Sequence, residues 1–319
     1  MNLDVTVAST ESAPTHIVFS PPRIRDGVLH RGVVATDDEE TIPTQLRRDL
    51  WTVAVLLHGA TIPVWHREVD LYMTSATFAE KCPQPQVHLT ARNFVDEATY
   101  YPLGIPKQVD VIFNVTWVPC KRHELMIDAL TWSKQRGRPI SCLWFGYHWC
   151  SGWEQREADL RNEVQRRKLN VTFAEVDFNA AEINRRYNVC RSALICSSRE
   201  AGPRVMTEAM LADIPYIATC DTYGGSPELV TSDCGIVCEP TGEAIASAIW
   251  RACDERSSFA PRAWAQEYLC TRASLPILRE SLVRVQQNRG WRINLDELCF
   301  PGIDWLGRLA TVRNAEAAL

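Results

Sequence analysis

The chain has 319 residues, of which 46% are hydrophobic and 23% are charged, and its formal net charge is −5. These values are ordinary for a globular protein of two domains, and they exclude a disordered, collagen-like or small disulfide-stapled chain. The negative charge excludes a global basic field for a nucleic-acid backbone, although a local basic cleft, and so nucleic acid as a partner, stays open.

The sequence carries no apolar run of the roughly 20 residues that a membrane-spanning helix needs. Its most apolar run, Val53–Leu57, ends at His58, and residues 1–11 lack the basic and apolar regions of a signal peptide. We therefore expect a cytoplasmic protein without a membrane span. Its 12 cysteines are expected to be reduced thiols, and because no CxxC pair occurs, we expect no metal site.

Residues 1–105 show a less regular pattern, and we expect them to form a reduced α/β domain. Strands are predicted for Ile17–Ser20, Val28–Ala35, Val53–Leu57 and Val69–Tyr72, and short helices for Thr44–Leu50 and Ser75–Lys81.

Residues 106–275 alternate short apolar runs with amphipathic runs, which predicts βαβ units and a doubly wound parallel sheet. The predicted strands are Val109–Val115, Ile140–Phe145, Val171–Phe173, Ser192–Cys196 and Tyr216–Thr219. The predicted helices are Arg122–Gln135, Glu154–Lys168, Ala180–Cys190, Pro203–Ala212 and Gly242–Cys253. A long helix, Leu275–Gln287, opens the remaining segment, residues 276–319, which we expect to pack back toward the first domain.

The stretch after the predicted strand end at Cys196 is the most informative of the sequence. A short loop carries Glu200 and Gly202, and Pro203 suits the first position of a helix. The free N–H groups and the dipole of that helix favour an anion at the carboxyl ends of the strands, where open parallel sheets bind ligands. Carboxylates of Glu200 and Glu208 would flank the anion and accept hydrogen bonds from hydroxyls. The residues thus suggest a nucleotide sugar, with an ordinary loop–helix junction as the alternative.

A second glycine loop follows the next predicted strand. Gly224 and Gly225 lie in the run Asp221–Val230, which again reads as strand, glycine turn and helix or turn. Neighbouring strands would present both loops to one ligand.

Three stretches of the sequence resemble one enzyme family. Glu200 and Glu208 have the E-x7-E spacing of retaining glycosyltransferases of the GT-B fold, and the run 197–228 resembles glycosyltransferase family 4 (glycosyl transferases group 1). The run 93–102 (NFVDEATYYP) resembles the interdomain stretch of that family, and the run 111–125 resembles its first strand and phosphate-binding turn.

The resemblance covers roughly residues 90–275 and implies a GT-B-like α/β fold with two Rossmann-like doubly wound domains. Residues 1–105 would be the reduced acceptor-side domain, and residues 106–275 would bind the donor. The implied activity is retaining, metal-independent transfer of a sugar from a nucleoside-diphosphate sugar, UDP- or GDP-linked, to an acceptor hydroxyl. This sugar nucleotide would be a co-substrate, and no cofactor is implied.

The family resemblance also implies a role for each site residue. Glu200 would contact donor-sugar hydroxyls near the reacting carbon, and Glu208 would hold the ribose. The diphosphate would be lined by Gly202, Pro203 and Arg204, neutralised by Lys121 or Arg122, and bordered by Gly224 and Gly225. His58 resembles a histidine at a strand end of the acceptor domain that would orient acceptor or donor.

Two departures from the family pattern keep other functions open. Where the family usually has Gly-Arg before the lysine turn, this chain has Thr116 and Trp117, and the acceptor-side domain is short. A non-catalytic nucleotide-sugar or glycan-binding relative or partner subunit is one alternative. A transferase acting on a macromolecule such as DNA or protein is the other.

Overall fold

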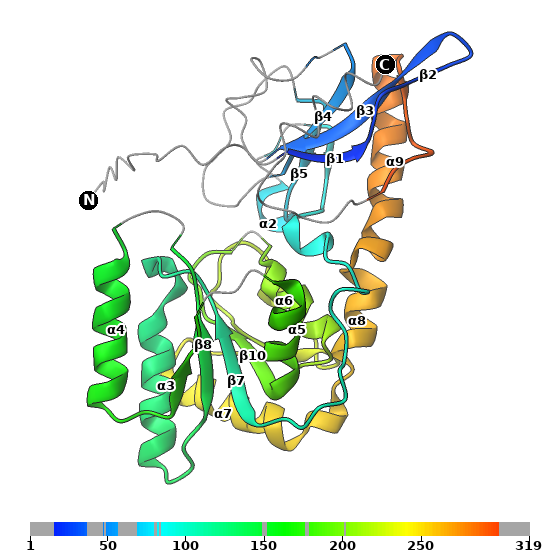
Figure 1. Cartoon of the computed structure of the whole chain (residues 1–319). Coiled ribbons are helices and arrows are strands. Elements are labelled where there is room, and N and C mark those ends of the chain that lie inside the picture. The colour runs from blue at the N-terminus through cyan, green and yellow to red at the C-terminus, as the bar shows by residue number, and fades with distance from the viewer. Residues whose placement is uncertain are drawn as a thin grey trace.

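Two β-sheets, each covered by helices, make up the structure, which is a computed structural model (Figure 1). The residues that it describes are 16–36, 47, 49–56, 69–79, 82, 84–148, 152–175, 179–200 and 202–299. Most of the predicted helix Thr44–Leu50 and all of residues 57–68, which include His58, lie outside these ranges.

Six parallel strands form the sheet of the second half of the chain. They are β7 (Val109–Asn114), β8 (Cys142–Phe145), β9 (Val171–Phe173), β10 (Cys190–Ile195), β11 (Tyr216–Thr219) and β12 (Gly235–Cys238). Their order across the sheet is β12-β11-β10-β7-β8-β9, which is the order of a dinucleotide-binding doubly wound fold. The chain therefore reverses its winding direction between β7 and β10, where ligands bind in such sheets.

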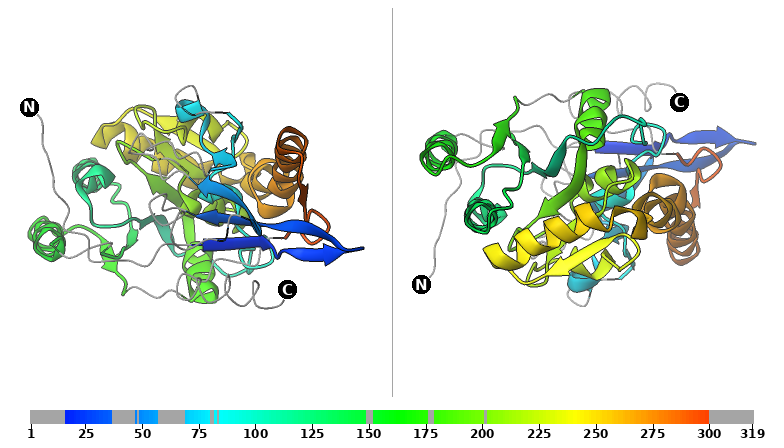
Figure 2. Two further views of the ribbon diagram at one scale, coloured as in Figure 1. Left: turned by 90° about the horizontal axis from the view of Figure 1, so that it is seen from above. Right: turned by 90° about the horizontal axis from the view of Figure 1, so that it is seen from below.

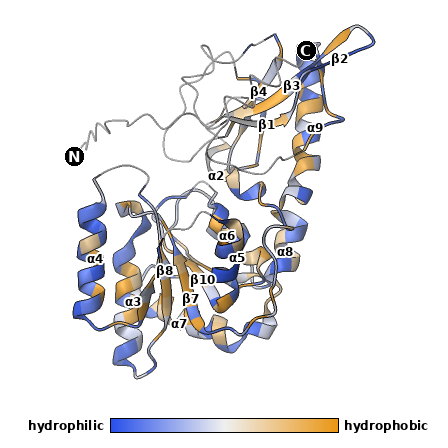
Figure 3. Cartoon of the chain, in the orientation of Figure 1, coloured by the Kyte–Doolittle hydropathy of each residue, from blue (hydrophilic) through white to orange (hydrophobic). Residues whose placement is uncertain are grey.

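Helices cover both faces of this sheet. They are α3 (His123–Gln135), α4 (Glu154–Arg166), α5 (Ala180–Val189), α6 (Arg204–Leu211), α7 (Gly242–Asp254) and α8 (Pro261–Tyr268). Alternate strand residues point to opposite faces, so Val111 and Phe113 pack with α3 and α7, whereas Ile112 packs with α5, α6 and α8. The strands are accordingly apolar along their length, while the outer faces of the helices are hydrophilic (Figure 3).

The helix ends of this half follow the expected chemistry with small shifts. Gly137 (φ 75°) and Asp213 (φ 60°) adopt the left-handed conformation just beyond α3 and α6, which Gly adopts freely and Asp tolerates. Pro203 is the residue before the first helical position of α6, not the first position itself. The predicted helix Ala180–Cys190 ends at Val189, and β10 begins at once with Cys190. Strand β12 and helix α8 were not predicted.

The first half of the chain forms the other sheet, which is the first sheet in chain order, so that the six-stranded sheet is the second. Its strands are β1 (His16–Ser20), β2 (Arg23–Arg25), β3 (Val28–Thr36), β4 (Trp51–Leu56), β5 (Leu71–Met73) and β6 (Gln86–Val87), joined by β13 (Arg292–Ile293). The order β1-β3-β4-β5-β6 is parallel from β3 to β6, whereas β1 and β2 run antiparallel to β3. The predicted helix Ser75–Lys81 is shorter in the described residues, where α2 covers Ala76–Ala79.

Helix α9 (Thr271–Arg289) returns the chain from the second sheet to the first (Figure 1). It begins four residues before the predicted start and contains Pro276. Leu278, Leu282 and Val285 are buried with side chains of β3, β4 and β5. Seen along the vertical axis, α9 lies at the opposite end of the molecule from α3 and α4 (Figure 2). The predicted domain limits at residues 105 and 275 stay a prediction.

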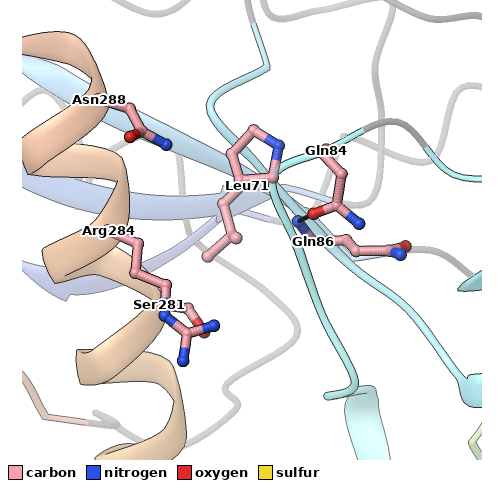
Figure 4. A pocket seen from close by; sticks show the side chains of 7 residues that line it. Leu71, Gln84, Gln86, Ser281, Arg284 and Asn288 are labelled. Atoms are coloured by element: carbon pink, nitrogen blue, oxygen red, sulfur yellow. Dashed lines mark hydrogen bonds between the residues drawn. The ribbon is translucent and has the colours of Figure 1, made fainter.

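A shallow pocket of about 220 Å³ lies where α9 meets β5 and β6 (Figure 4). Its lining is formed by Leu71, Gln84, Pro85, Gln86, Ser281, Arg284 and Asn288. None of these residues belongs to the two glycine loops. In the part of the chain that the structure describes, no helix has the length and apolar character to cross a bilayer.

We expect Leu278→Ala to lower the free energy of unfolding by about 2–5 kcal/mol, because it empties a fully buried site between α9 and the first sheet. The neighbouring Ile277 is 46% exposed, so Ile277→Ala is the matched control and should cost much less. Urea unfolding of both variants checks this. Equal losses would mean that α9 does not hold the first sheet.

Candidate active site

Three loops meet at the carboxyl ends of β7, β10 and β11. The N–H of Ser198 donates to the carbonyl of Cys120 (2.8 Å), which ties the β10 loop to the β7 loop. The N–H of Glu200 donates to the carbonyl of Tyr223 (2.7 Å), and the N–H of Tyr223 donates to the carbonyl of Ser198 (3.0 Å). The predicted arrangement of two glycine loops on adjacent strands is confirmed, since β10 and β11 are paired.

Lys121 and Glu200 form a buried ion pair at this point. Lys121 lies in the short 3-10 turn Pro119–Lys121 after β7, and its Nζ donates to Oε1 of Glu200. The hydroxyl of Ser197 donates to the same oxygen (2.7 Å). Burial lowers the pKa of Lys121, but the charge and hydrogen bond of Glu200 outweigh burial and raise it above its ordinary value. The ammonium of Lys121 is therefore charged at neutral pH.

Arg122 is engaged in holding the loops together. Its backbone is left-handed (φ 49°) just before α3, and its guanidinium forms two hydrogen bonds with Asp221, of 2.6 and 2.8 Å. The same group donates to the carbonyls of Cys196 and Ser197 and to Thr219 Oγ1. Whether Lys121 or Arg122 would neutralise a diphosphate stays a prediction.

Glu208 is buried, and two tyrosine hydroxyls contact its carboxylate. Its Oε2 accepts from the hydroxyl of Tyr187 (3.0 Å), Tyr100 is a second hydrogen-bond partner, and Arg204 Nε lies 3.6 Å from Oε1. Burial raises the pKa of Glu208, while Arg204 and the two tyrosines oppose this shift. A carboxylate offers about four acceptor positions, so these partners do not exhaust its capacity. Neither tyrosine was predicted as a site residue, although Tyr100 lies in the run 93–102 that resembles the interdomain stretch of the family.

Gly202 brings the β10 loop against the first half of the chain. A Cβ at this position would lie 1.9 Å from Thr90 Oγ1, so only glycine fits. Gly224 and Gly225 have positive φ angles of 118° and 90°, which is also a reason for glycine. The first turn of α6, from Pro203 and Arg204 onward, opens beside these loops, and the unpaired N–H groups of a helix start form an anion site.

Trp117 does not replace the arginine that the family carries at this place. Its ring is 1% exposed and stacks on His123 (5.4 Å between centroids) and Trp144 (5.8 Å). Burial lowers the pKa of His123 to about 4, so this stack is neutral at pH 7. The position supports the sheet and adds no charge to the site.

The residues named from the sequence therefore come together with one exception. One loop cluster contains Lys121, Glu200, Gly202, Arg204, Glu208, Gly224 and Gly225. His58 lies outside the described residues. Within the described ranges, no three His, Cys, Asp or Glu side chains are grouped so that they could hold a metal ion. Metal independence stays a prediction.

Comparison with solved structures identifies the class of fold. The chain matches a mutant of S. aureus TarM in complex with fondaparinux, alpha-GlcNAc-glycerol and UDP, with a TM-score of 0.56 and 13% identity over 74% of this chain. It matches Thermosynechococcus elongatus sucrose-phosphate synthase with a TM-score of 0.58 and 16% identity, over 79% of this chain and 70% of that one. It matches Anabaena HepE with UDP and glucose with a TM-score of 0.60 and 18% identity, over 73% of this chain and 72% of that one. The chain spans 51% of the TarM chain. The α/β structure with its parallel sheets is thus a GT-B fold.

The family follows from the sequence itself. Residues 102–265, more than half of the chain, match the family described as glycosyl transferases group 1. The protein belongs to that family, as the resemblance predicted. No curated protein sequence matches it.

The raised pKa of Glu208 has a consequence for stability. Above the ordinary glutamate pKa of about 4.3, the folded state holds this proton more tightly than the unfolded chain. The free energy of unfolding should therefore fall as pH rises from that value through the raised pKa. We expect Glu208→Gln to lose this part of the pH dependence in urea unfolding between pH 4 and 8.

Glu163→Gln is the control of opposite sign. Hydrogen bonds from Arg166 and Arg167 lower the pKa of Glu163 to about 2, so its contribution is present above pH 4.3 and is lost as pH falls toward 2. Identical pH slopes for the wild type and Glu208→Gln would contradict the assignment.

Proposed function

We propose that the protein is a retaining glycosyltransferase of family 4 that moves a sugar from a nucleoside-diphosphate sugar to an acceptor hydroxyl. The observation that carries this proposal is the buried Lys121–Glu200 pair beside the start of α6. The pair lies where the chain reverses its winding direction, between β7 and β10. A cation, a helix start and two glycine loops suit a diphosphate, and carboxylates suit the hydroxyls around it. Structural neighbours that were solved with UDP or UDP-glucose support a nucleotide donor.

Each residue has a proposed role in this reaction. Glu200 would accept hydrogen bonds from donor-sugar hydroxyls near the anomeric carbon, and Glu208 would accept them from the ribose. Lys121 and the first N–H groups of α6 would stabilise the charge on the leaving diphosphate. His58 would face the acceptor or the donor sugar.

The geometry around Glu200 suits a front-face substitution. In that step the acceptor oxygen bonds to the anomeric carbon while the bond from this carbon to the diphosphate oxygen breaks, and the acceptor proton passes to the leaving diphosphate. Oε1 of Glu200 is already engaged by Lys121 and Ser197, so the carboxylate is held as an acceptor of hydrogen bonds. We propose that no metal takes part and that the protein acts in the cytoplasm on a UDP- or GDP-sugar.

A second candidate function is a binding protein without transfer activity. The observation that favours it is Trp117, because an aromatic stack stands where the family pattern has an arginine. Without that arginine, the remaining cations would hold a donor without fully compensating the charge of a leaving diphosphate.

A donor panel tests the proposal. Full-length protein is incubated with UDP-glucose, UDP-N-acetylglucosamine, UDP-galactose, GDP-mannose, UDP and GDP, and both the unfolding midpoint and donor hydrolysis are measured. We expect one base to raise the midpoint, since a ligand at 100 times its Kd stabilises by about 2.7 kcal/mol. Lys121→Met should weaken nucleoside-diphosphate binding by roughly 10- to 100-fold, because hydrogen bonds to charged groups contribute about 1.5–3 kcal/mol.

Glu200→Gln separates the two candidate functions. A transferase should lose donor hydrolysis in this variant and keep most of its UDP or GDP affinity, whereas a binding protein shows no hydrolysis in any variant. Glu163→Gln, on the outer helix α4, is the matched control. No midpoint shift with any of the six compounds at millimolar concentration would contradict both functions.

A further inference from the structure

A polar junction joins the first half of the chain to the Gly224–Gly225 loop. The hydroxyl of Thr77 in α2 donates to Oε1 of Glu228 (3.4 Å). A Cβ on Gly225 would lie 3.3 Å from Thr77 Oγ1 and 3.7 Å from Cβ of Ser75. The glycine loop therefore lies directly against residues that follow β5.

Arg92 lies at the centre of this junction. It belongs to the 3-10 turn Ala91–Asn93 and is only 7% exposed. Its Nη1 donates to the carbonyl of Gly225 (3.5 Å), and its own carbonyl accepts from Thr207 Oγ1 (2.8 Å). Because Thr207 precedes Glu208 in α6, Arg92 is anchored to the helix of the site and reaches across to the glycine loop.

The junction has unused hydrogen-bonding capacity. Arg92 Nε, Ser75 Oγ and Ser226 Oγ are all buried, and none has a hydrogen-bond partner among the described residues. Burial lowers the pKa of Arg92 to about 10, and the nearby Glu228 carboxylate opposes that shift. The guanidinium therefore stays charged at pH 7. A buried cation with one long hydrogen bond is costly to keep, which argues for a role beyond packing.

The connection from Arg92 to the site runs through the backbone. Gly225 follows Tyr223 and Gly224, and the carbonyl of Tyr223 accepts the N–H of Glu200 at 2.7 Å. A shift of the glycine loop would therefore move the backbone that fixes Glu200.

We infer that Arg92 is a positioning residue: it holds the Gly224–Gly225 loop from the side of the first sheet and thereby sets the loop geometry on which binding of a nucleoside diphosphate depends. The ligand part of this inference rests on the proposed function. The holding part does not, because it concerns the ligand-free protein.

Two measurements on the full-length chain test this role. The first is hydrogen exchange of backbone amides in 221–230 without ligand, and the second is calorimetric titration with UDP and with GDP. Arg92→Ala should speed exchange in this segment about tenfold and weaken nucleoside-diphosphate binding about tenfold, because a hydrogen bond from a charged group is lost. Arg92→Lys keeps the charge and should restore part of both effects. Arg256→Ala removes a guanidinium that bonds Asp213 beyond the far end of α6, and it should change neither.

The location of the faster exchange separates positioning from general loss of structure. Arg92→Ala should speed exchange in 221–230 while the backbone amides of β8, on the other side of β7 in the sheet, keep their wild-type rates. Equally faster exchange in both segments would overturn the positioning role.

The remaining outcomes are also decisive. Unchanged exchange in Arg92→Ala would overturn the inference, and so would faster exchange with unaltered UDP and GDP affinity. If the wild type binds neither UDP nor GDP, the proposed function fails, and the exchange rates alone then decide whether Arg92 holds the loop.

Discussion

The candidate site depends on the parallel pairing of β7 with β10, which places Ser192 beside Val111 and Ala193 beside Ile112. These strands are far apart in sequence, yet their carboxyl ends come to lie side by side, so the turn after one carries Lys121 and the loop after the other carries Glu200. Successive strands are added outward in opposite directions from this pair. The place where the loops after β7 and β10 meet is therefore fixed by the strand order.

The charged side chains of this loop cluster lie beside groups of opposite charge or hydroxyl groups. Lys121 is neutralised by Glu200, Arg122 by Asp221, and Glu208 is covered by tyrosine hydroxyls and Arg204. Burying such groups costs free energy unless each is paired. The pairs also fix the side chains before any ligand arrives, so a ligand loses less conformational freedom of the protein on binding. The same argument makes the poorly satisfied Arg92 stand out, because its environment does not complete its hydrogen bonding in the free protein.

The alternation of apolar runs and amphipathic helices was sufficient to predict the parallel sheet, because a strand buried on both faces is apolar throughout. The loop cluster was predicted from the glycines that follow two predicted strands and from the E-x7-E spacing that resembles the family. Strand β12 (Gly235–Cys238), at the edge of the sheet, was missed. Tyr100, Tyr187 and Arg92 reach the site only through tertiary packing, and the contact of Arg122 with Asp221 also arises only in the folded chain. Contacts between distant segments of this kind leave no periodic or spacing signal.

The first sheet is completed by the last part of the described chain, since β13 pairs with β3 and α9 fills one of its faces. During synthesis the residues of the six-stranded sheet, up to Cys238, leave the ribosome before α9 does. The sheet of the second half can therefore form while strands β1 to β6 still lack their cover. An apolar face formed by Phe19, Val33 and Leu71 would stay open to solvent or chaperones until the ribosome has released residues beyond about 290. Truncation before that point would leave the second half of the chain able to fold and the first half prone to aggregation.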